Sequence, residues 1–167
     1  MKAHMQRLAR YNLWANDRLY AACADLPDES RRRDVGLYFG SVHLTLEHLL
    51  KTDRAWTHLL RGGTLADLPA MPVPEDFAAL RDARAGHDAL FVAWMDEVDE
   101  AWLEAPFAFT SALGSWQGLT WADTRGGTLA HVFNHHTHHR GQAHTGLSLL
   151  GADPPALDML VQGMLGA

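Results

Sequence analysis

Residues His131-Val-Phe-Asn-His-His-Thr-His-His-Arg-Gly-Gln142 contain a dense cluster of histidines, at His135, His136, His138 and His139. Imidazole is the commonest metal ligand among protein side chains, and two imidazoles one helical turn apart can bind the same ion. Apolar residues at helical spacing interrupt the cluster, which argues against a fully solvated histidine-rich tract. The stretch therefore predicts a metal site on the inner side of an amphipathic helix.

The histidine stretch lies in the last of four long segments that have a helical period. We expect Thr128 to cap this last helix after Gly126 and Gly127, and the helix to run to Leu150. The apolar stripe of a first helix recurs through residues 8–22. The upstream segments are, in order, this first helix ending near Pro27, a charged loop over 28–34, a second helix from about Phe39 to Leu60, and a third helix starting at Pro74-Glu75-Asp76.

The third helix and the segments after it complete the predicted fold. Pro74 is expected in the first turn of this helix, and its apolar stripe comprises Phe77, Leu80, Leu90, Phe91, Trp94 and Val98. Over 105–124 the helical period gives way to aromatic residues around turn-forming Gly114-Ser115 and Gly118, so a short β-hairpin or an ordered loop is expected. A short terminal helix is expected over 156–164. The sequence thus predicts an all-α four-helix bundle with this hairpin or loop before the last long helix.

The composition limits the class of protein. With 167 residues, 47% of them hydrophobic, the chain is long enough for one domain with its own core, and we expect a single domain over residues 1–167. The formal net charge of -6, without a dense Lys/Arg tract, argues against nucleic acid as a partner. Cys23 is the only cysteine, so an intrachain disulfide is excluded. Because no apolar run has membrane-spanning length and residues 1–26 lack a signal-peptide block, a cytoplasmic protein without a membrane partner is expected.

Helical-wheel positions, at about 100° per residue, separate the histidines of the second helix by direction. His43 and His58 fall on its polar face and are expected to contact water. His48 falls in the apolar arc beside Leu44 and is expected to point into the bundle. His87 of the third helix is isolated, and we expect it to be a hydrogen-bonded core residue, not a ligand.

The same reasoning sorts the histidines of the last helix. His138 and His144 lie on or next to its polar side. His139 lies among the residues of the buried side, His135 lies at the near edge of that side, and His136 lies further round. Together with one inward histidine of the second helix, the last three are the candidate metal ligands.

Two pairs within the last helix can converge on one ion. His135 and His139 are four residues apart, the spacing that HExxH zinc helices use, and His136 and His139 are three residues apart and converge as well. Residue geometry leaves both pairs open. His48 would supply the third ligand from a facing helix. Several neutral rings buried together lose hydrogen bonds unless something shared satisfies them, which favours a metal over a purely structural cluster.

Several segments of the chain resemble one known family when they are taken together and in order. They are Tyr-Asn-Leu-Trp-Ala-Asn at 11–16, Gly-Ser-Val at 40–42 followed by Leu-Glu-His-Leu-Leu at 46–50, Asp-Arg-Ala-Trp at 53–56, and Asn-His-x-x-x-His-Arg-Gly-Gln at 134–142. This set resembles the signature of the DinB family, within the DinB/YfiT-like superfamily of metal-dependent helical bundles. The resemblance covers the first, second and fourth long helices.

The resemblance implies an up-down-down-up bundle and a divalent metal ion, most often zinc or nickel, bound by His48, His135 and His139. It thereby selects the four-residue spacing over the pair that includes His136. Related members of the superfamily use a low-molecular-weight thiol, such as bacillithiol or mycothiol, in transferase or isomerase reactions. Arg140 and Gln142 belong to the family motif, and we assign them to helix packing and to hydrogen bonds around the ligands.

Three neutral imidazoles leave the charge of the ion intact, so a metal with a fourth open position would act as a Lewis acid toward water or a thiol. We therefore expect an enzyme that activates a small thiol for transfer to an electrophilic substrate, these two small molecules being its partners. The alternative is a non-catalytic metal-binding or stress-related interaction protein. A zincin is disfavoured because no glutamate lies between His135 and His139, and the Glu-x-x-His pattern of di-iron carboxylate bundles is missing.

The remaining expectations concern packing. Asp53 lies in the apolar arc of the second helix, where an unpaired carboxylate is expensive, so we expect it to pair with an arginine. Trp14, Trp56 and Trp94 are at core spacing and are expected to fill the interior. Exposed apolar residues on the outer helix faces are compatible with a homodimer.

Overall fold

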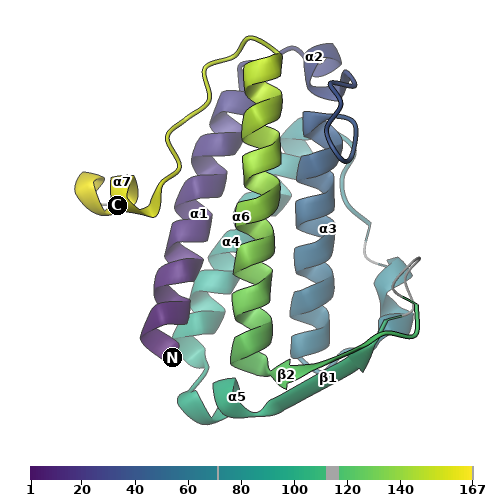
Figure 1. The fold of residues 1–167 in the computed structure, drawn as a ribbon, viewed down its shortest axis with the longest axis vertical. Helices are drawn as coiled ribbons and strands as arrows, with labels where there is room; N and C mark the ends of the chain where they lie inside the picture. The colour runs from purple at the N-terminus through teal and green to yellow at the C-terminus, as the bar shows by residue number, and fades with distance from the viewer. Residues whose placement is uncertain (71, 112–116, 167) are drawn as a thin grey trace.

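The described residues form a bundle of long helices packed side by side, and a two-stranded β-hairpin lies at one end of the bundle (Figure 1). A computed structural model describes residues 1–70, 72–111 and 117–166. Within them, no helix is long and apolar enough to cross a membrane. The elements are α1 (Lys2–Ala24), α2 (Asp28–Arg32), α3 (Val42–Leu60), the 3-10 helix η1 (Leu65–Ala70), α4 (Phe77–Glu97), α5 (Glu100–Glu104), β1 (Pro106–Thr110), β2 (Thr120–Thr124), α6 (Arg125–Leu149) and α7 (Met159–Leu165).

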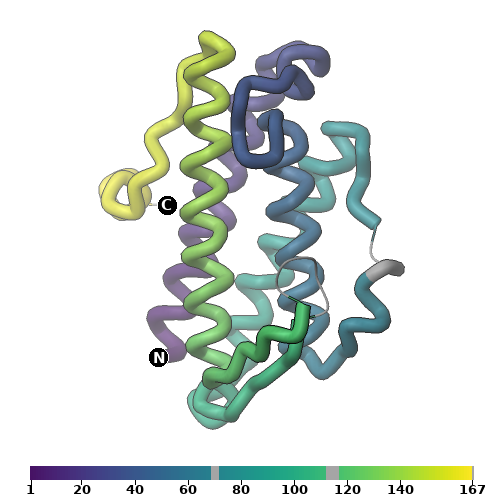
Figure 2. The backbone as a smooth tube through the Cα atoms, turned by 45° about the vertical axis from the view of Figure 1, so that its right-hand side comes forward, coloured from purple at the N-terminus to yellow at the C-terminus, as the bar shows by residue number. Residues whose placement is uncertain are grey.

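The connectivity of the long helices is up-down-down-up. In Figure 1, α1 rises from the N-terminus, α3 and α4 both descend, and α6 rises again from the hairpin. The described residues 61–70 and 72–76 lie between the lower end of α3 and the upper end of α4, so α4 can descend beside α3 (Figure 2). Helix α1 packs against α4 and α6, and α3 packs against the same two helices. The predicted all-α four-helix bundle and its topology are confirmed.

Helix α3 begins three residues later than the sequence predicts. Gly40 has φ +82°, in the left-handed region, so the helix cannot extend back through it to Phe39. Ser41 instead caps the helix, its hydroxyl oxygen accepting a hydrogen bond from the Leu44 amide at 3.2 Å. Phe39 consequently lies in the loop that precedes α3, a position that matters for the site described below.

Helices α4 and α6 also start at a side-chain cap other than the expected first residue. Asp76, not Pro74, begins α4, since its carboxylate accepts from the Ala79 amide at 2.9 Å. Thr124, not Thr128, caps α6, with 3.0 Å from the Gly127 amide to the Thr124 hydroxyl oxygen. Residues 28–32 form the short helix α2 within the region expected to be a loop, and the terminal helix starts at 159 instead of 156.

The hairpin predicted before the last helix is present. Strands β1 and β2 pair antiparallel, with Phe109 opposite Trp121. The predicted turn residues Gly114 and Ser115 lie outside the described residues. The indole N–H of Trp121 donates to the Thr128 hydroxyl at 3.0 Å, which anchors the hairpin on the first turns of α6.

The interior consists of two apolar clusters with a polar layer between them. The hairpin-side cluster includes Met5, Leu60, Phe91, Trp94, Leu129 and Phe133. The far-end cluster includes Leu19, Leu46, Leu50, Leu80 and Leu147. At the level between them, every long helix contributes buried polar side chains, and we call this set the polar layer: Asn12, Asn16, Asp53, Arg84, Asp88, His136 and Arg140.

Several residues expected in the core are not buried there. Leu44 and Leu90 are exposed, because the helix faces that carry them turn away from the neighbouring helices. Trp94 is buried as predicted. Trp14 and Trp56 are only half-buried; Trp56 packs against the edge of the hairpin-side cluster and against Phe109 of the hairpin, with ring centroids 5.2 Å apart.

Candidate metal centre

Three of the candidate histidines converge on the side of the bundle where α3 and α6 face each other. His48 comes from α3, and His135 and His139 come from successive turns of α6. One potential ligand nitrogen from each ring lies within 4.8 Å of the other two. The Nε2 atoms of His48 and His135 are 3.3 Å apart, and the rings of His135 and His139 have centroids 4.3 Å apart. The structure therefore brings the three predicted residues together at metal-binding distance.

Gln142 fixes the orientation of one imidazole in this group. The His139 Nδ1–H donates to the Gln142 side-chain oxygen at 2.8 Å, one turn further along α6. Because the proton of the neutral ring is then held on Nδ1, the Nε2 lone pair is free to act as a ligand. This matches the role assigned to Gln142 from the sequence. Its amide nitrogen lies 3.0 Å from the Nε2 atom of exposed His138.

An aromatic ring covers one side of the three histidines. Phe39 stacks on His48 with ring centroids 4.0 Å apart and an interplanar angle of 29°, and its centroid is 5.4 Å from that of His139. The sequence interpretation missed this contact because it placed Phe39 inside a helix. The signal that could have located it is Gly40, whose position just before a Ser cap marks the end of a loop.

The environment keeps the imidazoles in the form that binds metal. Burial, together with the neighbouring His139, lowers the pKa of His48 to about 4. Burial likewise lowers the pKa of His135 to about 3, with contributions from His139 and His48. The pKa of His139 is also lowered by burial. At neutral pH all three rings are therefore uncharged, so no proton has to be displaced from a ligand nitrogen. Three neutral imidazoles at this spacing fit a divalent ion of borderline softness.

His136, which residue geometry left as an alternative ligand, points the other way. Its ring is buried in the polar layer and bonds to the Asp53 carboxylate. Asp53 also accepts from Arg84 at 2.5 Å, which confirms the predicted pairing with an arginine. Burial alone would raise the pKa of Asp53, but His136 and Arg84 hold it below its ordinary value. The carboxylate thus explains why the pair converging on His48 is His135 and His139.

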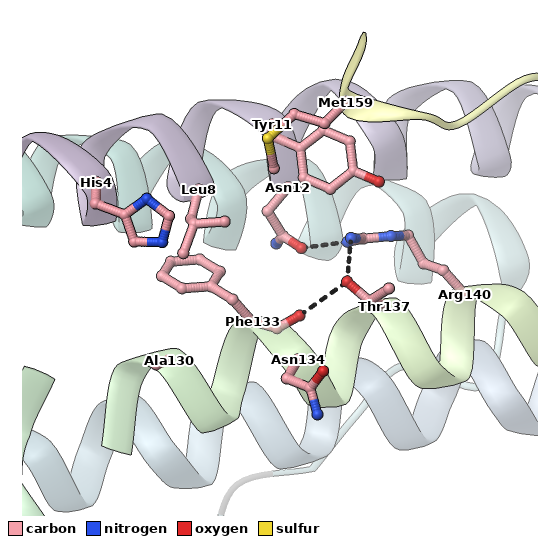
Figure 3. Close-up of a pocket in the computed structure, with 10 residues that line it drawn as sticks. All are labelled: His4, Leu8, Tyr11, Asn12, Ala130, Phe133, Asn134, Thr137, Arg140 and Met159. Atoms are coloured by element: carbon pink, nitrogen blue, oxygen red, sulfur yellow. Dashed lines mark hydrogen bonds between the residues drawn. The ribbon is translucent and has the colours of Figure 1, made fainter. Parts of the chain in front are cut away.

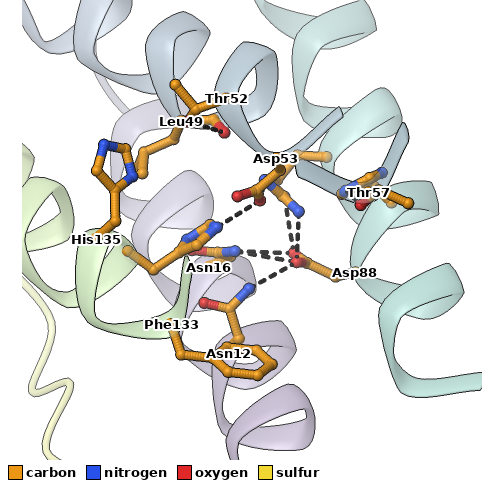
Figure 4. Close-up of polar contacts among 12 residues, drawn as sticks. Asn12, Asn16, Leu49, Thr52, Asp53, Thr57, Asp88, Phe133 and His135 are labelled. Carbon is orange, nitrogen blue, oxygen red and sulfur yellow. Dashed lines mark hydrogen bonds and ion pairs between the residues drawn. The ribbon is translucent and has the colours of Figure 1, made fainter. Parts of the chain in front are cut away.

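The polar layer joins all four long helices beside the histidine group. Arg84 donates to Asp88 at 2.7 Å, and Asn12 and Asn16 donate to the same carboxylate at 3.0 Å (Figure 4). Figure 4 also shows His135 pointing away from this layer. The Asp53–His136 contact ties α3 to α6 within two turns of the three histidines, so the layer holds the two helices that carry them in register.

The sequence interpretation did not find this layer as a unit. Its signal was present as polar pairs four residues apart inside otherwise apolar stripes, Asn12 with Asn16 in the first helix and Arg84 with Asp88 in the third. Residues four positions apart share one face of a helix, and here that face is the apolar one that packs inward. Each polar pair is therefore buried, and its side chains need hydrogen-bond partners from other helices.

The histidines outside the group were placed correctly in most cases. His58 bonds to Asp67 at 3.1 Å near the surface, and His87 lies 3.2 Å from the Thr57 hydroxyl, as a hydrogen-bonded residue. The expectation for His43 was wrong, because it is fully buried and not in contact with water. Phe77 of α4 lies over this first turn of α3, with ring centroids 6.4 Å apart, and the His43 ring bonds to Glu47 at 2.9 Å.

Comparison with known proteins gives the family. The sequence profile of the DinB family matches residues 1–164. The chain belongs to the DinB family. Among curated relatives, Protein DinB from Bacillus subtilis (strain 168) is 23% identical over 142 residues, covering 81% of this chain and 79% of that protein. The range matched by the family profile spans His48, His135 and His139.

Replacement of Gln142 tests the orientation of His139. In Gln142→Leu we expect the affinity for Zn²⁺ to fall by roughly ten- to a hundredfold, because the hydrogen bond that fixes the His139 tautomer is lost. The Gln142→Glu variant is the matched control, since a carboxylate still accepts from His139 and should retain the affinity. Competition titration with a zinc-chelating dye measures both. Equal affinities of the Leu and Glu variants would contradict the assignment.

Proposed function

We propose that this chain is a metal-dependent enzyme that activates a small thiol for transfer to an electrophilic substrate. The observation that carries the proposal is the convergence of His48, His135 and His139 within 4.8 Å in a member of the DinB family. These residues would hold a divalent ion, zinc or nickel foremost. Such an ion, bound by three neutral ligands, supplies a Lewis acid that favours the deprotonated form of a thiol at neutral pH.

The residues around the three histidines suit this chemistry. The polar layer and Gln142 hold the imidazoles in place before any ligand arrives, so binding requires little rearrangement. Phe39 shields one side of the group from water and offers an apolar surface to a substrate. Toward the hairpin, the ring of His131 lies 6.1 Å from that of His135 and 5.4 Å from that of Trp56, which extends the aromatic surface. An electrophile with an apolar or aromatic body is the substrate class that this surface favours.

We place this activity in the cytoplasm, where low-molecular-weight thiols are kept reduced. In the proposed reaction the thiol sulfur forms a bond to the electrophilic carbon and the leaving group departs with the electron pair of the broken bond. The thiol proton passes to solvent. Sulfur is neither oxidised nor reduced, so no further reagent is needed.

A thiol-transfer assay tests the proposal. Zinc- or nickel-loaded protein is incubated with bacillithiol or mycothiol and 1-chloro-2,4-dinitrobenzene, and thioether formation is followed by absorbance. We expect turnover above the spontaneous rate, and its loss by more than about a hundredfold in His139→Ala, since a missing ligand costs more than a missing partner of a ligand. Metal-loaded protein that shows no turnover with either thiol would overturn the catalytic proposal and favour a metal-binding role.

A further inference from the structure

A cavity of about 250 Å³ lies between α1 and α6, on a different face of α6 from the three histidines. Figure 3 shows its two parts. Leu8, Phe133 and Met159 provide apolar walls, and Asn12, Thr137 and Arg140 form a polar end. Because Tyr11, which also lines the cavity, donates to the Leu157 carbonyl at 2.6 Å, the C-terminal segment is held along one wall. The volume is below that of most drug-sized sites, so it suits a small molecule.

The polar end contains a buried cation that has no carboxylate partner within the described residues. Arg140 is 3% exposed, and its guanidinium contacts neutral groups: it bonds to oxygens of Asn12, Asn16 and Thr137, and its central carbon lies 5.1 Å from the centroid of the Tyr11 ring. An arginine side chain remains protonated in proteins, so this guanidinium carries a full positive charge. A buried charge is normally compensated by an opposite charge.

The positive charge of Arg84, the other arginine of the polar layer, is fully compensated by carboxylates. Arg84 is 2% exposed and forms ion pairs with both carboxylates of the layer, at 2.5 Å to Asp53 and 2.7 Å to Asp88. Asn12 donates to Asp88 and accepts from Arg140, so its amide separates Arg140 from the nearest carboxylate of the layer. Arg140 thus differs from Arg84 in two ways. It lines a cavity, and within the described residues no carboxylate forms an ion pair with it.

We propose that the α1–α6 cavity is a binding site for a small monocarboxylate with a short apolar chain. The carboxylate accepts hydrogen bonds from the Arg140 guanidinium, and the chain packs against Leu8, Phe133 and Met159. One buried guanidinium at the polar end matches one negative charge better than the two of a phosphate monoester. The site is separate from the histidine group, because residues 133, 137 and 140 face α1 while residues 135 and 139 face α3.

The test uses hexanoate as the probe and its neutral isostere hexanamide as the control ligand. The full-length metal-loaded protein, labelled with ¹³C at the methionine methyl groups, is titrated with each and followed by NMR. We expect saturable shifts of the Met159 methyl with hexanoate, none at buried Met95 in the core, and roughly ten- to a hundredfold weaker binding of hexanamide, because the charge-assisted bonds to Arg140 are lost. Equal binding of the two probes, or no shift at Met159, would overturn the proposal.

A pair of variants tests the location without disturbing the polar layer. Ala130 lines the cavity at its exposed rim, and Ala130→Phe is expected to fill the cavity and weaken hexanoate binding at least about tenfold. Ala78→Phe makes the same change at an exposed position on α4 and should leave binding unchanged. Unaltered binding in Ala130→Phe would contradict the site. Because neither readout depends on turnover, failure here leaves the proposed thiol chemistry untouched, and the reverse also holds.

Discussion

His48→Ala and His139→Ala are each expected to abolish stoichiometric metal loading. Each variant removes one of three ligands that come from two helices, and among the described residues His48, His135 and His139 form the one group of potential ligands at metal-binding spacing. Loss of a residue that only orients a ligand costs about ten- to a hundredfold in affinity, so loss of a ligand should cost more than about a hundredfold. Metal content of the purified variants, measured by inductively coupled plasma mass spectrometry, checks this directly.

The control for these variants lies on the same helix as His48. His58 of α3 bonds to Asp67 near the surface and takes no part in the group, so His58→Ala should retain full loading. Unchanged thermal melting of the chelated proteins shows that the variants fold. Stoichiometric metal in folded His48→Ala would mean that α3 supplies no ligand and that the three-histidine assignment is wrong.

Arg84→Met is expected to lower the free energy of unfolding by about 3–5 kcal/mol, because it breaks a buried network of ion pairs. The substitution leaves the carboxylates of Asp53 and Asp88 buried without their common cation. Burial alone would lower the pKa of Arg84, but Asp88 and Asp53 raise it above its ordinary value, so the lost group is a permanent charge. Urea denaturation at neutral pH measures the change.

Arg81→Met is the matched control for this effect. Arg81 lies one turn earlier on α4 with half of its side chain exposed, and its contact with Asp82 is at the surface, at 3.6 Å. Its replacement should change the free energy of unfolding by no more than about 0.5 kcal/mol. If Arg84→Met were equally mild, the polar layer would not be the interaction that holds the four helices at this level.

The helical bundle was predictable because its signals are local and repeated. Apolar residues three and four positions apart mark the long helices, and glycine and proline mark their ends. The exact starts were less predictable, since Thr124 and Thr128 are equally good caps by residue type. Contact of Trp121 with the Thr128 hydroxyl, a tertiary interaction, decided which of them begins α6.

For the candidate site, too, the sequence predicted what depends on one helix and missed what depends on contacts between helices. The wheel placed His48 and His139 on inner faces, but it could not choose between His135 and His136, which differ by only one residue. Asp53 makes that choice by binding His136, and its partner Arg84 lies 31 residues away in the chain. The burial of His43 was missed for a similar reason, because the covering residue Phe77 comes from another helix.

An anomalous-difference map most directly tests the central claim that three imidazoles from two helices share one cation. Crystals of protein purified without chelator would be measured at the zinc and nickel absorption edges. We predict a single peak bonded to ring nitrogens of His48, His135 and His139, at the roughly 2.0–2.1 Å typical of zinc–imidazole bonds. A peak bonded to other residues, or metal-containing crystals without a peak between these three rings, would contradict the claim.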